Sequence, residues 1–429
     1  MNNISFSELG LADPIQHALT ARNHVIPTPI QARAIPELLA GRDMLGIAQT
    51  GTGKTAAFAL PILHQLSRKR GNNRPGSPRA LILAPTRELA IQIGDEFRAY
   101  GKHLHLRQTV IVGGVSQKPQ VDALRRGVEI LVATPGRLLD LVGQRRLGLE
   151  AVEFFVLDEG DRMLDMGFVR DVRKIVSALP KTRQSLLFSA TMPSEVARLS
   201  GEILADPVRV EVTPQATPIE RLEQKIYHVD AAGKRALLAS ILSDPALSRV
   251  IVFTRTKHRA NRVADHLGKF GVAAEAIHGN KSQGARQRAL NQFRAGDARV
   301  LVATDIAARG IDIDGVTHVI NYELPNESES YIHRIGRTAR AGAGGVAISF
   351  CDPSERAYLS GIERLIQRRL TVVGEEPAAA APAVAVPDGW GKAKKARGES
   401  WRKRRRSHAT VEIANDHRPN RARRRRRAA

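Results

Sequence analysis

A glycine-rich turn near the start of the chain carries the residue types that hold a triphosphate. Residues 45–55 read LGIAQTGTGKT and end in Lys54 and Thr55. Backbone N–H groups of such a turn surround phosphate oxygens, the lysine adds a positive charge, and the threonine hydroxyl binds Mg²⁺. The first position of the usual G-x-x-x-x-G-K-[ST] spacing is Ala48 here, so the turn alone is also compatible with an ordinary tight turn.

A second segment supplies the acidic groups that triphosphate hydrolysis needs. Residues 153–161 read EFFVLDEGD, an apolar run that ends in Asp158 and Glu159. An acidic pair at the end of a strand can hold the water shell of a metal ion and orient the attacking water. The two segments together predict a nucleoside triphosphate site.

The composition is that of a globular protein with more than one core. With 429 residues, 42% of them hydrophobic, the chain predicts two domains. No stretch approaches the ~20 apolar residues of a membrane helix, and the start MNNISFSELGLADP lacks the pattern of a secretory signal. Cys351 is the one cysteine in the sequence, which excludes disulfides within the chain, argues against a cysteine-based zinc site and predicts a reducing, cytoplasmic setting.

The positive charge is concentrated at the C-terminal end of the sequence. From Gly391 onward the chain has 16 Lys/Arg against three Asp/Glu, which is +13 of the net +23 and leaves +10 for the other 390 residues. A polycationic tail on a mildly basic body predicts an anionic polymer as the partner. Trp390 and Trp401 lie in or beside this tail and either stack on bases or are incidental.

Apolar runs alternate with helical patterns along most of the chain. Strand-like runs lie at 81–85, 129–135, 153–159 and 185–191, and again at 249–256, 299–305, 317–325 and 345–350. Helical patterns between them include 86–99, 193–204, 258–269 and 285–293. This alternation predicts an α/β fold with parallel sheets covered by helices on both faces.

The two series of strands predict two similar domains. We expect a first domain at 1–205, a linker at 206–220, a second domain at 221–373 and a disordered tail at 374–429, which is rich in Pro and Ala and then in Arg and Lys. Polar clusters follow the strand runs in both domains, and open α/β sheets bind ligands at that edge.

Three arginines of the second domain lie three residues apart, at Arg334, Arg337 and Arg340. On a helix this spacing places them on one face, and an ordinary solvated basic face is the simple interpretation. The second domain lacks a phosphate turn of its own, so we favour arginines that reach a triphosphate held by the first domain and stabilise charge on the transferring group.

Nine motifs in order give the chain a family resemblance. They are PTPIQ at 27–31, AQTGTGKT at 48–55, PTRELA at 85–90, GG at 113–114, TPGR at 134–137, DEGD at 158–161, SAT at 189–191, ATDIAARGID at 303–312 and HRIGRTAR at 333–340. Over roughly residues 4–370 the chain resembles the DEAD-box ATP-dependent RNA helicases, and within them the bacterial RhlE-type branch with a basic tail. The resemblance implies two tandem RecA-like domains.

The resemblance also implies the residues of an ATP and Mg²⁺ site. Gln31 would read the adenine edge, with Phe6 stacked on the ring. The phosphates would be held by Ala48, Gln49, Thr50, Gly51, Thr52, Gly53, Lys54 and Thr55. Asp158 would hold Mg²⁺ through water and Glu159 would polarise the attacking water. Asp312 would approach the ribose, and Arg337 and Arg340 would act as arginine fingers.

A third implied set concerns RNA and its coupling to ATP. Ser189, Thr191 and His333 would belong to the coupling machinery, with Asp161 as the link. The residues implied to line the RNA track are Arg87, Gly114, Thr134, Arg137, Arg286 and Thr304. In this family the track grips the sugar–phosphate backbone, so little base sequence is read. Without the resemblance, the same residues are ordinary caps and turns at strand ends.

Two departures from the family pattern stand out. Gly160 replaces the alanine of the acidic motif, although Asp158, Glu159 and Asp161 keep their register. Asn23 and His24 replace the usual glycine and aromatic residue before PTPIQ. We expect activity to survive the first change, while the second affects packing behind the adenine.

The sequence therefore predicts an RNA-dependent ATPase that separates short RNA duplexes or remodels RNA–protein complexes by closing two domains around ATP and RNA. The alternative is an RNA-binding clamp or annealing factor with weak or no ATPase activity, and translocation on DNA is a third possibility. The ribosome or the RNA-decay machinery are conceivable protein partners, and the sequence names neither.

Overall fold

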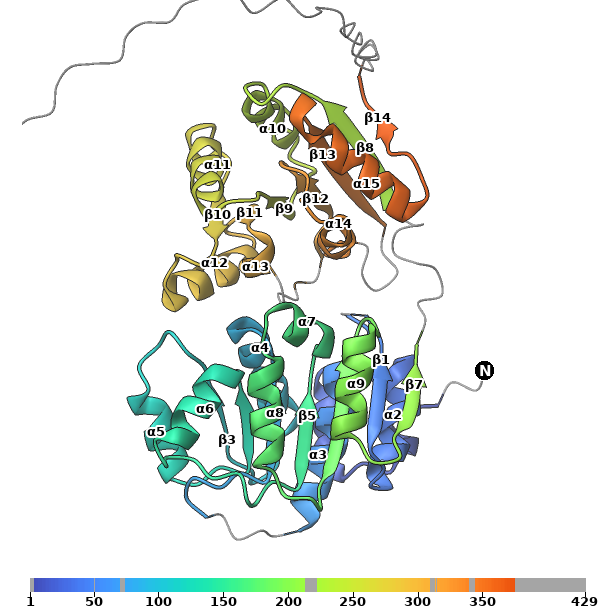
Figure 1. The fold of residues 1–429 in the computed structure, drawn as a ribbon, viewed down its shortest axis with the longest axis vertical. Coiled ribbons are helices and arrows are strands. Elements are labelled where there is room, and N and C mark those ends of the chain that lie inside the picture. Colours follow the sequence, from blue (N-terminus) through green and yellow to red (C-terminus); the bar gives the residue numbers. More distant parts are fainter. Residues whose placement is uncertain are drawn as a thin grey trace, which may run out of the picture. The chain divides into compact units, whose positions relative to one another are not determined.

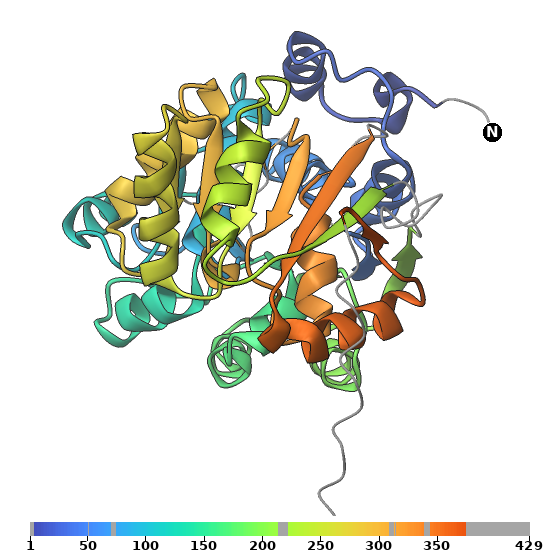
Figure 2. The ribbon, with the colours of Figure 1, turned by 90° about the horizontal axis from the view of Figure 1, so that it is seen from above.

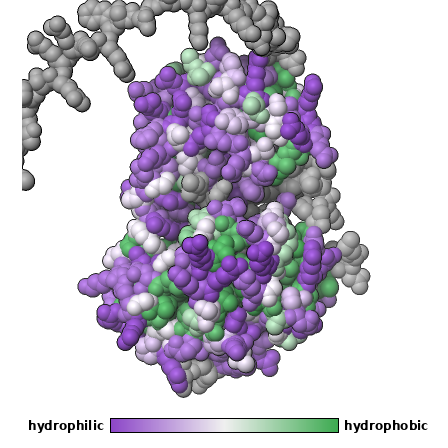
Figure 3. All heavy atoms as spheres, in the orientation of Figure 1, coloured by the Kyte–Doolittle hydropathy of each residue, from purple (hydrophilic) through white to green (hydrophobic). Residues whose placement is uncertain are grey.

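The computed structural model describes residues 4–49, 51–69, 74–212, 222–308, 313, 315–338 and 344–374. The predicted tail lies outside these residues except for Gly374, and so do Trp390 and Trp401. Among the described residues no helix is long and apolar enough to cross a membrane. Hydrophilic side chains cover much of the face shown in Figure 3, with apolar ones scattered among them.

The first domain is built on a seven-stranded sheet in the order β3-β4-β2-β5-β6-β1-β7, and every pair is parallel (Figure 1). Its strands are β1 (Met44–Ile47), β2 (Ala80–Leu83), β3 (Gln108–Ile111), β4 (Ile130–Ala133), β5 (Phe154–Leu157), β6 (Gln184–Ser189) and β7 (Val208–Glu211). Most of these strands are short and apolar, as expected for strands buried on both faces.

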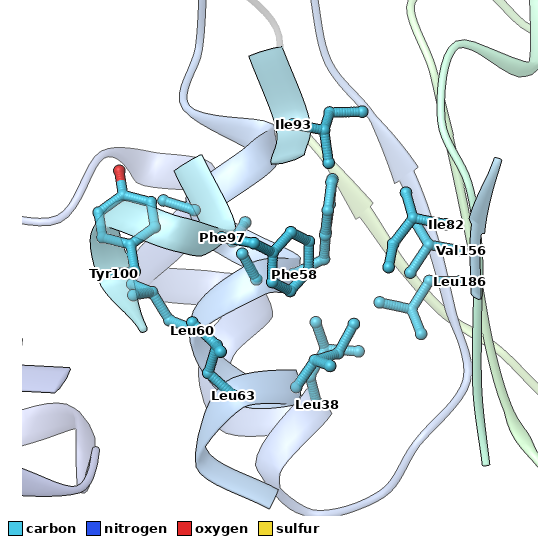
Figure 4. Packing of buried hydrophobic residues seen from close by; sticks show 14 of the residues in the cluster. Leu38, Phe58, Leu60, Leu63, Ile82, Ile93, Phe97, Tyr100, Val156 and Leu186 are labelled. Carbon is cyan, nitrogen blue, oxygen red and sulfur yellow. The ribbon is translucent and has the colours of Figure 1, made fainter. Parts of the chain in front are cut away.

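Helices cover both faces of this sheet. They are η1 (Phe6–Leu9), α1 (Asp13–Ala21), α2 (Pro29–Leu39), α3 (Lys54–Arg68), α4 (Arg87–Tyr100), α5 (Lys118–Arg125), α6 (Pro135–Gly143), α7 (Gly160–Asp165), α8 (Val169–Ser177) and α9 (Ser194–Ile203). One core joins α2, α3 and α4 to one face, where Phe58 and Phe97 pack near Ile82 and Leu186 (Figure 4). The alternate strand residues, such as Leu187, face a second core with α6, α8 and α9.

The second domain repeats the topology of the first. Its seven-stranded sheet has the order β10-β11-β9-β12-β13-β8-β14, which is the first order with every strand number raised by seven. The strands are β8 (Leu222–His228), β9 (Val250–Phe253), β10 (Ala274–Ile277), β11 (Val300–Ala303), β12 (His318–Asn321), β13 (Gly345–Cys351) and β14 (Thr371–Val372), all paired in parallel. This identical order confirms the prediction of two similar domains.

The helices of the second domain also divide between two faces. They are α10 (Lys234–Leu242), α11 (Lys257–Lys269), α12 (Gln283–Ala295), α13 (Asp305–Ala308), α14 (Ser328–Ile335), η3 (Pro353–Glu355) and α15 (Arg356–Ile366). Apolar residues of α10 and α11 pack on one face of the sheet (Figure 2). Those of α12, α14 and α15 pack on the other.

The eight predicted strand runs are all strands, but the expected linker begins too early. Val208–Glu211 forms β7, which pairs with β1, and the Val212 N–H donates to the Ile47 carbonyl at 3.0 Å. The first domain therefore continues to Val212, and residues 213–220 lie outside the described part. Only Val210 of this strand is buried, as is usual at a sheet edge. The segment therefore lacks the continuous apolar run that marks the central strands in the sequence.

The backbone conformation at Asn23 explains why the family that the chain resembles usually carries glycine at this position. It follows the end of α1 with a φ of 58°, in the left-handed region, and its N–H donates to the Thr20 carbonyl. Glycine adopts this conformation without strain, and asparagine does so more readily than other residues. The next residue, His24, lies beside Tyr100, with ring centroids 6.1 Å apart.

We predict that Asn23→Gly raises the free energy of unfolding by roughly 0.5–1 kcal/mol, because it removes the strain of a side chain in the left-handed region. Asn23→Ala is the matched control and should lower it, since alanine keeps the strain and loses the polar side chain. Urea unfolding of the three proteins measures both values. Equal stabilities for the glycine and alanine variants would contradict the assignment.

Candidate nucleotide and RNA site

The phosphate turn connects the end of β1 to the start of α3. Gly51 and Gly53 have φ values of 83° and 91°, which other residues rarely adopt, and α3 begins at Lys54. The Lys54 ammonium donates to the Ala48 carbonyl at 2.9 Å, and the Thr52 hydroxyl donates to the Gln49 carbonyl at 2.8 Å. Thr50 lies outside the described residues. The N–H groups at the start of α3 are thus presented to one small region, as phosphate binding requires.

Gln31 is fixed against this turn. Its amide oxygen accepts from the Thr28 N–H at 2.9 Å, and its amide nitrogen donates to the Gly53 carbonyl at 3.0 Å. A Cβ atom at Gly53 would lie 2.4 Å from that nitrogen and would displace the Gln31 amide, while the φ of 91° itself favours glycine. Phe6 is only 4% exposed and belongs to the core of the first domain. Phe6 packs there among core residues, and its stacking on adenine stays a prediction.

Asp158 and Glu159 follow β5 at the same edge of the sheet and are both buried. Burial is the main reason why the pKa of the Asp158 carboxyl is raised to about 6. The Lys54 ammonium lowers this pKa, and the Glu159 charge raises it. The charge of Lys54 therefore acts on Asp158. Glu159 has a φ of 54°, an uncommon conformation for this residue and one often found at functional sites.

Gly160 begins α7 directly after this pair. A Cβ atom there would lie 3.3 Å from the Leu187 Cδ2 methyl, which is a tight contact in a packed core. Glycine therefore fits without displacing its neighbours, and the residues around it keep their places at the strand end.

Arg162 is a site residue that sequence reasoning missed. Its Nη1 donates to both oxygens of the Glu159 carboxylate, at 2.7 and 2.6 Å, and both side chains are buried. The spacing of three residues on a helix was the available signal. It was overlooked because α7 is only six residues long and carries no helical pattern.

Asp161 joins the acidic motif to the turn after β6. Its Oδ2 accepts from the Thr191 N–H at 2.9 Å, from the Thr191 hydroxyl at 3.0 Å and from the Ala190 N–H at 3.1 Å. The Ser189 hydroxyl accepts from the Asp161 N–H at 3.2 Å and donates to the Thr191 carbonyl at 2.7 Å. These hydrogen bonds connect the two segments directly.

Arg334 and Arg337 do not lie on one helix, so the expectation of a shared helix face is wrong for these two arginines. Helix α14 ends at Ile335, and Arg334 is 1% exposed, with its guanidinium paired to both oxygens of Asp305 at 2.6 and 2.8 Å. Arg337 lies beyond the helix end. Arg334 is therefore a structural residue, whereas Arg340 and Asp312 lie outside the described residues.

Arg337 is buried, and its Nε donates to the His333 carbonyl at 3.2 Å. Burial lowers the pKa of Arg337 to about 9; the Arg162 charge lowers it further and the Glu159 charge opposes the shift. Both of those groups belong to the first domain. An arginine of the second domain therefore interacts electrostatically with Glu159 of the first.

Most residues implied to contact RNA line one cavity of about 450 Å³. Arg87, Thr134, Arg137 and Arg286 are among its lining residues. Gly114 supports Arg87, because a Cβ atom at this glycine would lie 2.1 Å from the Arg87 Nη1. Thr304 follows β11 at its carboxyl end and is not among the lining residues given for this cavity.

Glu88 is a second residue that the sequence reasoning did not single out. It is buried at the start of α4, and its two carboxylate oxygens contact Gln283 Nε2 at 2.9 Å and Arg286 Nη2 at 3.0 Å. Gln283 and Arg286 belong to α12 of the second domain. One carboxylate thus connects the two domains at the wall of the cavity.

Two tandem parallel α/β domains, of which the first holds a phosphate turn and an acidic strand end, define a nucleoside triphosphatase of the helicase type. Family models agree: residues 28–199 match the DEAD/DEAH box helicase domain and residues 233–342 match the helicase conserved C-terminal domain. The chain is 43% identical to the DEAD-box ATP-dependent RNA helicase CshA of Bacillus cereus, over 85% of this chain and 69% of the relative. It is 42% identical to RhpA of Helicobacter pylori, over 85% and 73%.

Solved structures agree with these matches. Dbp5 of Saccharomyces cerevisiae, bound to RNA and ADP BeF3, is 35% identical and superimposes with a TM-score of 0.75 over 86% of this chain and 95% of that one. Mss116p bound to single-stranded RNA and AMP-PNP has a TM-score of 0.77 at 28% identity, over 88% and 80%. The chain belongs to the DEAD-box ATP-dependent RNA helicases.

The raised pKa of Asp158 predicts how its substitution depends on pH. Between the unfolded-state pKa of ~3.9 and about 6 the folded protein holds a proton that the unfolded chain releases, so this contribution to stability falls as the pH rises. Asp158→Asn removes the buried charge. It should raise the free energy of unfolding by roughly 1–3 kcal/mol near neutral pH and by much less below about pH 4.5.

Urea unfolding at the two pH values, without nucleotide or Mg²⁺, measures this difference. Asp140→Asn is the control, because Asp140 is a more exposed carboxylate of the same domain. An equal gain at both pH values for Asp158→Asn would contradict a raised pKa.

Proposed function

We propose that this protein is an RNA-dependent ATPase that separates short RNA duplexes or remodels RNA–protein complexes. The proposal depends on Arg337, which belongs to the second domain and yet interacts electrostatically with Glu159 of the first. A site completed by both domains makes hydrolysis conditional on their closure. ATP and RNA together would favour closure, and hydrolysis would release the RNA. The Dbp5 structure, solved with RNA and ADP BeF3, supports the same coupling here.

The proposed reaction is attack of water on the γ-phosphate of ATP. The water oxygen bonds to phosphorus while the bond to the ADP oxygen breaks, and the water proton leaves by way of Glu159. Lys54 neutralises phosphate charge from the turn. Arg337, together with Arg340, would stabilise the charge that builds on the transferring group, which is where arginine is most effective.

The donor set fits Mg²⁺ that is held partly by water and phosphate. The described residues contain no group of three or more His, Cys, Asp or Glu able to hold a metal unaided. Mg²⁺ commonly keeps several waters and uses one or two carboxylates plus substrate phosphates. We propose that Asp158, through water, and the Thr55 hydroxyl would hold the ion, which when bound neutralises charge on the phosphates.

The RNA track is proposed along the cavity that Arg87, Thr134 and Arg137 line. Their guanidinium and hydroxyl groups suit phosphate and sugar oxygens, which give affinity without reading base sequence. The bonds from Asp161 to the turn after β6 offer a route by which strand contacts reach the ATP site. Ser189, Thr191 and His333 are proposed to couple the two activities.

We also propose a finer placement of the protein. The basic tail supports the RhlE-type branch of the family. The single cysteine supports a cytoplasmic location. Candidate protein partners are the ribosome and the RNA-decay machinery.

The first prediction from this function concerns Glu159. In a phosphate-release assay single-stranded RNA should stimulate the wild-type ATPase clearly. Glu159→Gln should lower turnover by roughly 10²–10⁴-fold, because it removes the group that accepts the water proton. A fluorescent ATP analogue should still bind the variant, since the amide keeps the shape of the carboxylate.

Three outcomes would redirect the interpretation. Equal rates with and without RNA would refute the coupling. Normal turnover by Glu159→Gln would refute its role, and an absence of RNA-stimulated release by the wild-type protein would favour an RNA clamp without catalysis. DNA in place of RNA in the same assay tests for translocation on DNA.

The second prediction concerns the basic tail. Deletion of residues 374–429 should weaken binding to single-stranded RNA and flatten the plot of log affinity against log salt by about 0.7 for each phosphate that the tail neutralises. Fluorescence anisotropy at several salt concentrations measures the slope. Replacement of the tail by a neutral linker of equal length is the control, and an unchanged slope would remove the tail from RNA binding.

A further inference from the structure

The ion pair of Glu159 and Arg162 is buried in the first domain, beside the phosphate turn. Glu159 and Arg162 are 3% and 7% exposed as residues. Arg162 Nη1 contacts one carboxylate oxygen at 2.7 Å and the other at 2.6 Å. One nitrogen at nearly equal distance from both oxygens lies close to the bisector of the carboxylate, so it fixes the direction in which the carboxylate points and its distance from Arg162.

The backbone at Glu159 gives this pair its importance. Glu159 precedes the first helical residue of α7 with a left-handed φ of 54°, so its side chain does not follow the usual directions of a helix. Its N–H donates to the Asp158 carboxylate at 2.9 Å, which holds the backbone in place. The carboxylate itself is held by Arg162, which lies one turn further along α7.

Stability alone is a poor reason for such a pair. A buried ion pair often contributes little net stability compared with well-packed apolar residues, because both ions lose hydration. What a buried ion pair does more reliably is fix the direction of the two charged groups. The Arg162 charge also acts on Arg337 of the second domain, so this arginine interacts electrostatically with the proposed arginine finger as well as with the carboxylate.

We propose that Arg162 is a positioning residue that holds the Glu159 carboxylate in the orientation needed to take the proton of the attacking water. This inference depends on the proposed ATPase function and on the role of Glu159 in it. Arg162 does not contact the nucleotide in this scheme. It restricts the carboxylate before RNA and ATP close the site, so that closure finds the base already in place.

The test compares Arg162→Met, Arg162→Lys and the control Arg173→Met. Arg173 forms a comparable two-contact ion pair with Glu202 at 2.7 Å, on the surface of the same domain and away from the site. RNA-stimulated phosphate release should give a kcat roughly 10–100-fold lower for Arg162→Met, with KM for ATP within about twofold of wild type. Arg162→Lys keeps the charge and one donor and should recover part of the loss, while Arg173→Met should match wild type.

A second readout does not involve turnover. Urea unfolding of Glu159→Gln, Arg162→Met and the double variant forms a cycle, in which a coupling energy between the two sites shows that the pair exists in solution. Binding of a fluorescent ATP analogue to Arg162→Met should remain within about twofold of wild type, because the phosphate turn is unchanged.

The results distinguish a failure of the Arg162 role from a failure of the proposed ATPase function. If the wild-type protein fails to hydrolyse ATP with RNA, or Glu159→Gln is fully active, the proposed function has failed. If both behave as proposed, a kcat within about threefold of wild type for Arg162→Met overturns the positioning role. The role is equally overturned if Arg162→Met loses ATP binding as much as kcat, or if Arg162→Lys, when folded, is no better than Arg162→Met.

Discussion

The parallel register of β5, β6 and β1 is the constraint on which the nucleotide site depends. Leu157 at the end of β5 lies opposite Leu187 of β6, and Ser189 of β6 lies opposite Ile47 at the end of β1. These pairings bring the acidic strand end, the turn after β6 and the phosphate turn to one edge of the sheet. A shift of one residue would turn the side chains of a strand to the opposite face. The chemistry of the site is therefore set by backbone pairing before any side chain is considered.

Much of this arrangement could be predicted from the sequence because it depends on residues that are close together in the chain. The apolar runs mark the buried strands, and the polar residues that follow them mark the ligand edge. The glycines of the phosphate turn have left-handed φ values, and strand pairing brings this turn and the acidic strand end to one edge of the sheet. Strands with less apolar sequences, such as β3 with its half-buried residues, gave no comparable signal.

The remainder could not be predicted because it depends on partners that are distant in the sequence. Arg334 has the spacing of a functional arginine, yet it is committed to Asp305, which lies 29 residues away. Glu88 is committed to Arg286 in the other domain. Arg162 is close in sequence to Glu159, but its value is apparent only once both side chains are seen to be buried. In each case the sequence shows which residues are charged, and the tertiary structure determines which residue of opposite charge each of them contacts.

The edges of the two sheets have a consequence for the behaviour of the protein in concentrated solution. An open strand edge can pair with another chain and start aggregation. The first sheet ends in β7, whose Arg209 and Glu211 side chains point outward and pair with each other at 2.9 Å. The second sheet ends in β14, which offers only the two residues Thr371 and Val372. The β7 and β14 edges are thus charged or short, which discourages β-pairing between molecules at these two edges when many of them bind one polyanion.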